Sequence, residues 1–270
     1  MDTPRSGTTT ASPLSAAVHA VAERTAELLR AGADPAAPIP GAQWTVGEAA
    51  AHLALANALM ADLAAGRERP YGDGTPGGLA AANSASLQAF TERDPSILAD
   101  AIVRHARAFT DATGARSADE QVVTPMGPMD LGTFGSYLLT HMLGHGYDIA
   151  VALRRPHMID RERVALTLPF LITAMPRVVD PRSATGHNAC YALRLRGGPR
   201  LAVTFTDGAV AVTREPPRRA DCTIVAEPVT FFLLALGRRT SMGALARGKI
   251  AAWGRRPWLA PGFATLFTAP

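Results

Sequence analysis

Residues 140–150 read THMLGHGYDIA, a largely apolar stretch that carries two histidines. The spacing of apolar residues around it predicts one long helix, which begins after an N-cap at Asp130 and continues beyond the quoted residues. His141 and His145 are four residues apart, so their side chains lie on one helix face, roughly 6 Å apart along the axis. Asp148 falls on the same face. The stretch is therefore either half of a metal site or a pair of core histidines.

Helix signals earlier in the chain predict a helical bundle. Thr45 and Glu48 form a T-x-x-E capping box, which predicts a helix from Val46 to Ala65. Asp94 followed by proline is typical of an N-cap with proline at the first helical position. Further helices are expected at residues 12–31, 79–92, 95–113 and 131–154. Four of these helices are long, which favours an antiparallel four-helix bundle.

The pattern changes after Pro156. Apolar and polar residues alternate in short segments separated by glycine or proline, which predicts a β-meander. The expected strands are CYALRLRG (190–197), RLAVTFTDG (200–208), AVAVTREPP (209–217), DCTIVAE (221–227) and GKIAAWG (248–254), and the expected helices are residues 161–178, 228–237 and 256–267. We therefore expect an α+β chain of two domains: a disordered tail (1–11), a helical bundle (12–156) and a small α+β domain (157–270).

The charge is distributed unevenly between the two halves. Residues 1–150 carry nine arginines against 16 aspartates and glutamates, whereas residues 151–270 carry 18 basic against 7 acidic residues. Such asymmetry fits either two domains of opposite charge that face each other or a basic half that receives an anionic small-molecule ligand. Basic and aromatic residues are not interleaved, so we expect no nucleic-acid partner.

We read no signal peptide and no membrane-spanning segment, and we expect a cytoplasmic monomer or homodimer. Cys190 and Cys222 are far apart and are interpreted as small buried residues.

His52 provides the third element of a candidate metal site. It lies midway along the capped helix, among alanines and leucines, and a histidine that faces a bundle core needs a partner for its ring nitrogens. His52, His141 and His145 could share one divalent metal, most simply zinc, with a position left open for water or substrate. Asp148 would orient a ligand histidine. The alternative is that all three are satisfied core histidines. Glu48 faces the same side as His52, and we interpret it as part of the capping box rather than as a ligand.

Four segments resemble the mycothiol-dependent maleylpyruvate isomerase family of actinobacteria. They are WTVGEAAAHLAL (44–55), LLTHMLGHGYDIAVAL (138–153), EPVTFFLLALGRR (227–239) and GKIAAWGRRP (248–257). The resemblance implies a DinB-like metal-binding four-helix bundle joined to a sterol-carrier-like α+β domain. It implies His52 and His145 as metal ligands, and it implies a glutamate at the position that His141 occupies here. It also implies a catalytic arginine at Arg238, with Arg239 as a neighbour that could bind the cofactor or replace Arg238.

The resemblance further implies a thiol-assisted reaction. Mycothiol or a similar low-molecular-weight thiol would attack an electrophilic small molecule, giving an isomerase or an S-transferase. A histidine in place of the glutamate makes the metal a stronger Lewis acid, which leaves open a thiol-independent lyase, hydrolase or isomerase of secondary metabolism. A third alternative is a non-enzymatic carrier whose apolar helix at residues 228–237 lines a ligand pocket, although that helix is more simply interpreted as core.

Overall fold

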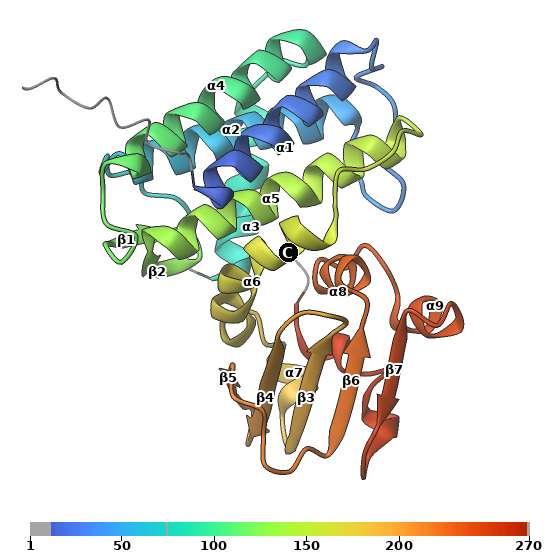
Figure 1. Ribbon diagram of the computed structural model, residues 1–270. Helices are drawn as coiled ribbons and strands as arrows, with labels where there is room; N and C mark the ends of the chain where they lie inside the picture. Colours follow the sequence, from blue (N-terminus) through green and yellow to red (C-terminus); the bar gives the residue numbers. More distant parts are fainter. Residues whose placement is uncertain (1–11, 74, 269–270) are drawn as a thin grey trace, which may run out of the picture.

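The computed structural model describes residues 12–73 and 75–268, so the disordered tail expected at residues 1–11 lies outside the described residues. The first half is helical, as expected, and Figure 1 shows its helices above a smaller sheet-containing part. The helices are α1 (Pro13–Arg30), α2 (Val46–Ala64), α3 (Pro76–Ala89), α4 (Pro95–Gly114) and α5 (Leu131–Ala152). A short hairpin of β1 (Gln121–Thr124) and β2 (Gly127–Asp130) precedes α5.

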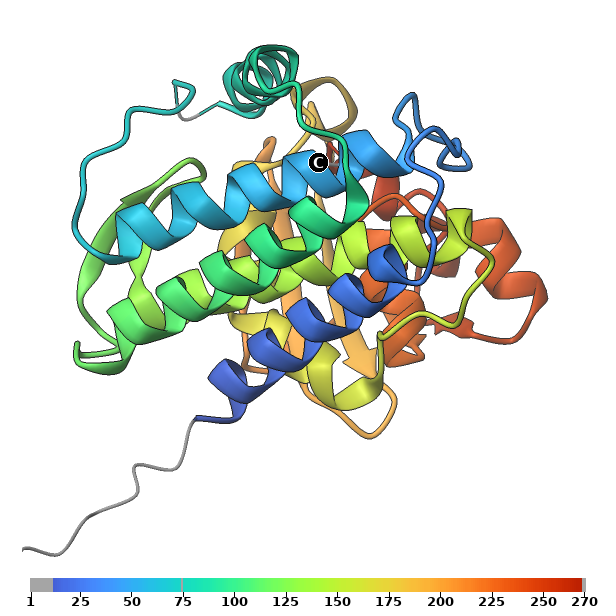
Figure 2. The same cartoon turned by 90° about the horizontal axis from the view of Figure 1, so that it is seen from above.

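Four of these helices form the predicted bundle. α1 and α2 each pack against both α4 and α5, so the four helices form a ring in which α1 lies opposite α2. Figure 2 shows them side by side, with α3 outside the ring next to α2. The predicted caps are confirmed: Thr45 and Glu48 form the full capping box of α2, and Asp94 and Asp130 cap α4 and α5.

The second half contains a five-stranded sheet, which confirms the α+β class. Its strands are β3 (Ala189–Leu195), β4 (Arg200–Thr206), β5 (Ala209–Thr213), β6 (Cys222–Ala226) and β7 (Ile250–Trp253). The spatial order is β5-β4-β3-β6-β7, in which β3 and β6 run parallel and all other neighbours run antiparallel. The helices of this half are α6 (Arg161–Ala174), α7 (Pro181–Ala184), α8 (Pro228–Ala235) and α9 (Ser241–Ala246).

Three helix predictions differ from the structure by three residues or more at one end, or in type. The helix expected at 161–178 ends at Ala174 and continues as a single 3-10 turn, where proline at position 176 removes a backbone donor. The helix expected at 256–267 is instead two 3-10 turns, Pro257–Leu259 and Ala264–Leu266, separated by proline and glycine. The helix expected at 79–92 begins three residues earlier because Thr75 caps it. The short helices α7 and α9 were not predicted.

One hydrophobic core joins the bundle to the second half. Side chains of α6 and α8, such as Leu171, Phe232 and Leu233, are buried together with those of α5. A second core lies beneath the sheet around Tyr191 and Phe205. Since α6 packs on both α5 and α8, a domain boundary at residue 156 stays a prediction. Each described helix is too short or too polar to cross a lipid bilayer.

Candidate metal centre

Three histidines from two helices meet at the α2–α5 edge of the bundle. His52 comes from the middle of α2, and His141 and His145 come from successive turns of α5. The Nε2 atoms of His52 and His141 lie 3.0 Å apart, and one ring nitrogen of each histidine lies within 4.8 Å of the others. The structure therefore brings together the three histidines that the sequence singled out.

Burial keeps at least two of these rings neutral. Burial, followed by the nearby His145, lowers the pKa of His52 to about 3. The pKa of His141 is also well below its ordinary value because of burial, the two other histidines and Arg238. The Nδ1 atoms of His141 and His145 are buried and have no hydrogen-bond partner among the described residues. A neutral imidazole with an unpartnered nitrogen has a lone pair available for a metal.

Trp44 covers two of the histidines. Its ring centroid lies 4.8 Å from that of His52 and 5.8 Å from that of His145, and it stacks on the latter at an interplanar angle of 24°. Trp44 was not predicted to be part of the site. Trp44 lies just before the N-cap Thr45, outside α2, so helical spacing alone does not place its ring against the histidines.

Asp148 links the histidines to the second half of the chain. Its two carboxylate oxygens accept hydrogen bonds from Nε and Nη2 of Arg238, at 3.2 and 2.9 Å. Its Oδ2 atom is 3.5 Å from Nδ1 of His145, a contact too long to count as a good hydrogen bond. Burial alone would raise the pKa of Asp148, but His145 and Arg238 together lower it below its ordinary value. Asp148 therefore stays ionised and is held mainly by Arg238.

The two arginines after α8 differ in their contacts. Arg238 also donates from Nη1 to the carbonyl oxygen of Leu236 at 2.6 Å, which fixes the guanidinium on both sides. Arg239 is half-buried and makes no hydrogen bond or ion pair with the described residues. Close packing supports this turn, because a Cβ atom at Gly144 of α5 would lie only 3.0 Å from the side chain of Leu236.

The remaining histidines and the two cysteines lie apart from this cluster. His19 pairs with Thr110 at 2.6 Å, and His187 pairs with Tyr191 at 2.9 Å, so both are satisfied by other partners. Cys190 is half-buried, and burial raises the pKa of Cys222, which fits the interpretation of small core residues.

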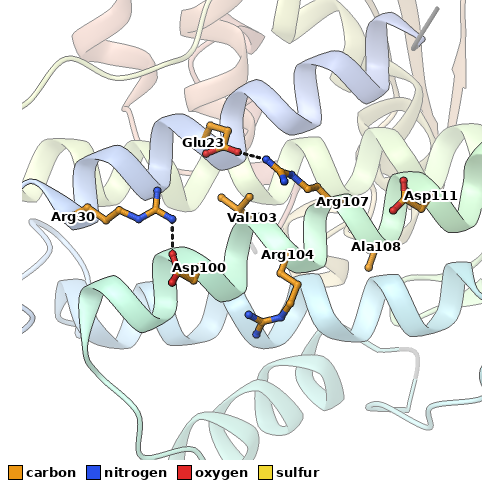
Figure 3. Close-up of a pocket in the computed structure, with 8 residues that line it drawn as sticks. All are labelled: Glu23, Arg30, Asp100, Val103, Arg104, Arg107, Ala108 and Asp111. Carbon is orange, nitrogen blue, oxygen red and sulfur yellow. Dashed lines mark hydrogen bonds and ion pairs between the residues drawn. The ribbon is translucent and has the colours of Figure 1, made fainter. Parts of the chain in front are cut away.

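A surface groove of about 690 Å³ runs along the opposite edge of the bundle, between α1 and α4 (Figure 3). Its walls carry the ion pairs Arg30–Asp100, at 2.5 Å, and Arg107–Glu23, at 2.7 Å. Because the α1–α4 edge lies across the ring from the α2–α5 edge, this groove is not part of the histidine site.

Comparison with known proteins agrees with this architecture. Residues 15–150 match the family described as the mycothiol maleylpyruvate isomerase N-terminal domain, and residues 176–254 match the SCP-2 sterol transfer family. None of the curated proteins with which the sequence was compared matches it.

One solved structure shows the same fold across both halves. A crystal structure of a histidine-to-alanine mutant of the mycothiol-dependent maleylpyruvate isomerase aligns over 88% of this chain and 91% of that chain, with a TM-score of 0.52 and 14% identity. The isomerase without the mutation aligns over 84% and 88%, with a TM-score of 0.47 and 13% identity. The chain spans only 24% of the sec-alkylsulfatase Pisa1 from Pseudomonas sp., with 52% of this chain aligned, a TM-score of 0.36 and 16% identity. Because the family model matches half of its residues, this chain belongs to the mycothiol maleylpyruvate isomerase family, and it carries an SCP-2-type second domain.

Proposed function

We propose that the protein is a metal-dependent enzyme that uses mycothiol, or a similar low-molecular-weight thiol, to isomerise or conjugate an electrophilic anionic small molecule. The observation that carries the proposal is the convergence of His52, His141 and His145 within 4.8 Å. Membership of the isomerase family supports an isomerase-type reaction. The dependence on a metal and the class of substrate are our proposal.

The chemistry of the donor set fits a divalent metal. Three imidazoles from two helices present buried nitrogens at one point, and two of the rings have an Nδ1 atom without a hydrogen-bond partner. Nitrogen donors in this number suit a catalytic zinc site, in which a fourth position stays open for another ligand. A bound zinc ion would act as a Lewis acid and favour the thiolate form of a thiol beside it.

The chain's own residues would orient the reactants. Trp44 packs on His52 and His145, and it would hold the two rings in place and exclude water from one side. Asp148 stays ionised against Arg238 and would keep that guanidinium at the site. Arg238 has N–H groups left over after these contacts, and Arg239 has no competing ion pair, so the two arginines would bind a substrate carboxylate or a developing enolate oxygen.

In the isomerisation, the thiolate would add to one carbon of a conjugated double bond. The electron pair of that bond would move onto the carbonyl oxygen, where the arginine N–H groups stabilise the negative charge. Rotation about the resulting single bond, followed by expulsion of the thiolate, would give the trans product with no net change in atoms. In an S-transferase, protonation of the adduct would release it as the thioether.

Metal analysis of the purified protein tests the proposal first. We expect about one equivalent of zinc or another divalent metal, lost in His52→Ala and in His145→Ala, because each variant removes one of three ligands. His105→Ala is the matched control, since His105 also lies in a bundle helix but outside the cluster. Absence of metal both after purification and after reconstitution would reject the metal site.

Dependence on added thiol tests the reaction. Turnover of maleylpyruvate-like conjugated acids that requires mycothiol would support the proposed chemistry. A second candidate, a thiol-independent metal lyase or hydrolase, is favoured by one observation: all three candidate ligands are histidines, with no carboxylate among them. Full turnover without any thiol would support that second candidate. The apolar side chains of α8 are buried in the common core, so they give no support to the carrier alternative.

A further inference from the structure

Two arginines are paired in register on the same face of the five-stranded sheet. Arg194 of β3 is paired in register with Arg200 of β4. Successive strand residues point to opposite faces, so these two side chains lie on the face turned away from the buried Leu193 and Leu201. Like charges directly opposite each other on neighbouring strands are destabilising. An arrangement of this kind favours a ligand that neutralises the pair.

Neither arginine has an acidic partner within the described part of the chain. No ion pair or hydrogen bond with the described residues engages either guanidinium. Asp221, which directly precedes β6, accepts from Arg255 at 2.6 Å and from the backbone N–H of Cys190 at 2.9 Å. The guanidinium of Arg194 lies over the ring of Trp253, 5.9 Å from its centroid. This cation–π contact holds the side chain in place without neutralising its charge.

The loop between β5 and β6 turns this face into a pocket of about 210 Å³. Pro216 and Pro217 form a wall over the strands, and Arg218 of the same loop adds a third guanidinium. Thr223 lines the pocket as well, and although its side chain is mostly buried, its hydroxyl makes no hydrogen bond with the described residues. Three arginines and a threonine whose hydroxyl has no partner among the described residues thus line one small cavity.

We propose that this pocket binds the phosphate group of a small molecule. Guanidinium groups match phosphate oxygens with paired N–H donors, and a threonine hydroxyl can donate to a further oxygen. The volume is several times the roughly 30 Å³ that a water molecule occupies in the liquid. It is below the roughly 300–1,000 Å³ of pockets for drug-sized ligands. A phosphate with a short attached group fits this size, and it would come from a soluble phosphomonoester or from an anionic lipid headgroup.

The site stands independently of the histidine cluster, because the two share no residue. Part of the basic excess of the second half of the chain lies at this pocket. That half carries 18 arginines and lysines and only 7 acidic residues. The proposal therefore does not depend on the reaction at the metal centre, and either can fail without the other.

We test the proposal by calorimetric titration at constant ionic strength, with inorganic phosphate and with glycerol 3-phosphate. We expect saturable binding to the full chain and a loss of affinity of about tenfold or more in Arg194→Gln/Arg200→Gln. The matched control is Arg182→Gln/Arg247→Gln, which removes the same charge from two exposed arginines outside the pocket. Equal binding by the two double variants, or no binding to the unmodified chain, would overturn the proposal for a soluble ligand.

Two further measurements separate folding from binding and identify the source of the phosphate. Without ligand, Arg200→Gln is expected to raise the melting temperature because the repulsion with Arg194 is removed, and added phosphate should stabilise the unmodified chain more than this variant.

Flotation with phosphatidylglycerol vesicles, compared with phosphatidylcholine vesicles, tests the lipid source. Vesicle binding that the Arg194→Gln/Arg200→Gln variant loses indicates a headgroup, and binding of glycerol 3-phosphate alone indicates a soluble ligand. Failure of both arms rejects the site.

Discussion

Arg238, in the turn after α8, holds Asp148 of α5 through two nitrogen atoms, at 2.9 and 3.2 Å. The contact joins residues that are 90 positions apart and belong to the two families that the sequence combines. Asp148 also lies 3.5 Å from His145, so it is the one residue between the cation of the second domain and a candidate metal ligand.

Removal of this cation is expected to destabilise the whole protein. Only 12% of the Asp148 side chain is exposed, so Arg238→Gln leaves a nearly buried carboxylate without its partner and lowers the free energy of unfolding by about 2 kcal/mol. Urea denaturation measures this change. The double variant Asp148→Asn/Arg238→Gln should lose less than the sum of the single variants.

The surface pair Arg30–Asp100 provides the comparison. Its side chains are 43% and 64% exposed, so Arg30→Gln should change the stability by no more than about 0.5 kcal/mol. An effect of Arg238→Gln as small as that of Arg30→Gln would show that the interdomain pair contributes little.

Chelation should lower the melting temperature of the unmodified protein. A metal that binds only the folded state stabilises it by about 4 kcal/mol when its free concentration is a thousand times its dissociation constant. His52→Ala/His145→Ala should melt at the same temperature with and without chelator, and added zinc should restore the unmodified protein. Identical melting curves for the unmodified protein in both conditions would contradict the proposed site.

Trp44 should report metal binding by its fluorescence. Its ring contacts those of His52 and His145, whereas Trp253 and Trp258 are 47% and 67% exposed. In the background Trp253→Phe/Trp258→Phe, emission from Trp44 should be quenched when cobalt(II) binds, because the ion would lie next to the stacked ring. The same background with His145→Ala serves as the control, and quenching that persists there would place the ion elsewhere.

Glu227 should give a pH-dependent contribution to stability. It caps α8 by accepting from the backbone N–H groups of Val229 and Thr230, at 3.1 and 2.9 Å. Burial alone would raise its pKa, but the hydrogen bonds from Thr230 and Val229 and the charge of Lys249 lower the pKa below its ordinary value. Because the folded pKa is the lower one, the stabilisation is complete above the unfolded pKa and disappears as the pH falls through the folded value.

Glu227→Gln is therefore expected to cost about 1 kcal/mol at neutral pH and clearly less below about pH 4. Denaturation midpoints at several pH values measure the difference. Glu68→Gln, at an exposed position, should show no such trend. A cost that stays constant with pH would mean that the charge of Glu227 is not what stabilises α8.

The sequence predicted those parts of the fold that local chemistry controls. The T-x-x-E box at Thr45 and the N-caps at Asp94 and Asp130 are signals within a few residues, and all three are confirmed. The strands were predicted because apolar and polar residues alternate along them. The last segment, residues 256–267, was predicted as one helix, but Pro261 and Gly262 interrupt it.

The candidate site was predictable to the extent that it lies on single helices. The pair His141 and His145 follows from helical spacing, and His52 follows from its position in a capped helix. The contact between Trp44 and His145 and the pairing of Arg238 with Asp148 depend on how separate elements pack. No short-range pattern encodes such contacts, and Asp148 accordingly lies closer to Arg238 than to the histidine that it was expected to orient.

The close approach of Gly144 to Leu236 has a consequence for how such chains can be assembled by recombination. Gly144, in the segment matched by the first family, leaves room for Leu236 of the segment matched by the second. Two residues after Leu236, Arg238 pairs with Asp148 across the same interface. Exchange of second domains between relatives would keep these two contacts only if the incoming domain brought a side chain that fits beside Gly144 and an arginine that reaches Asp148. The two domains are thus expected to be inherited together, as partners fitted to each other.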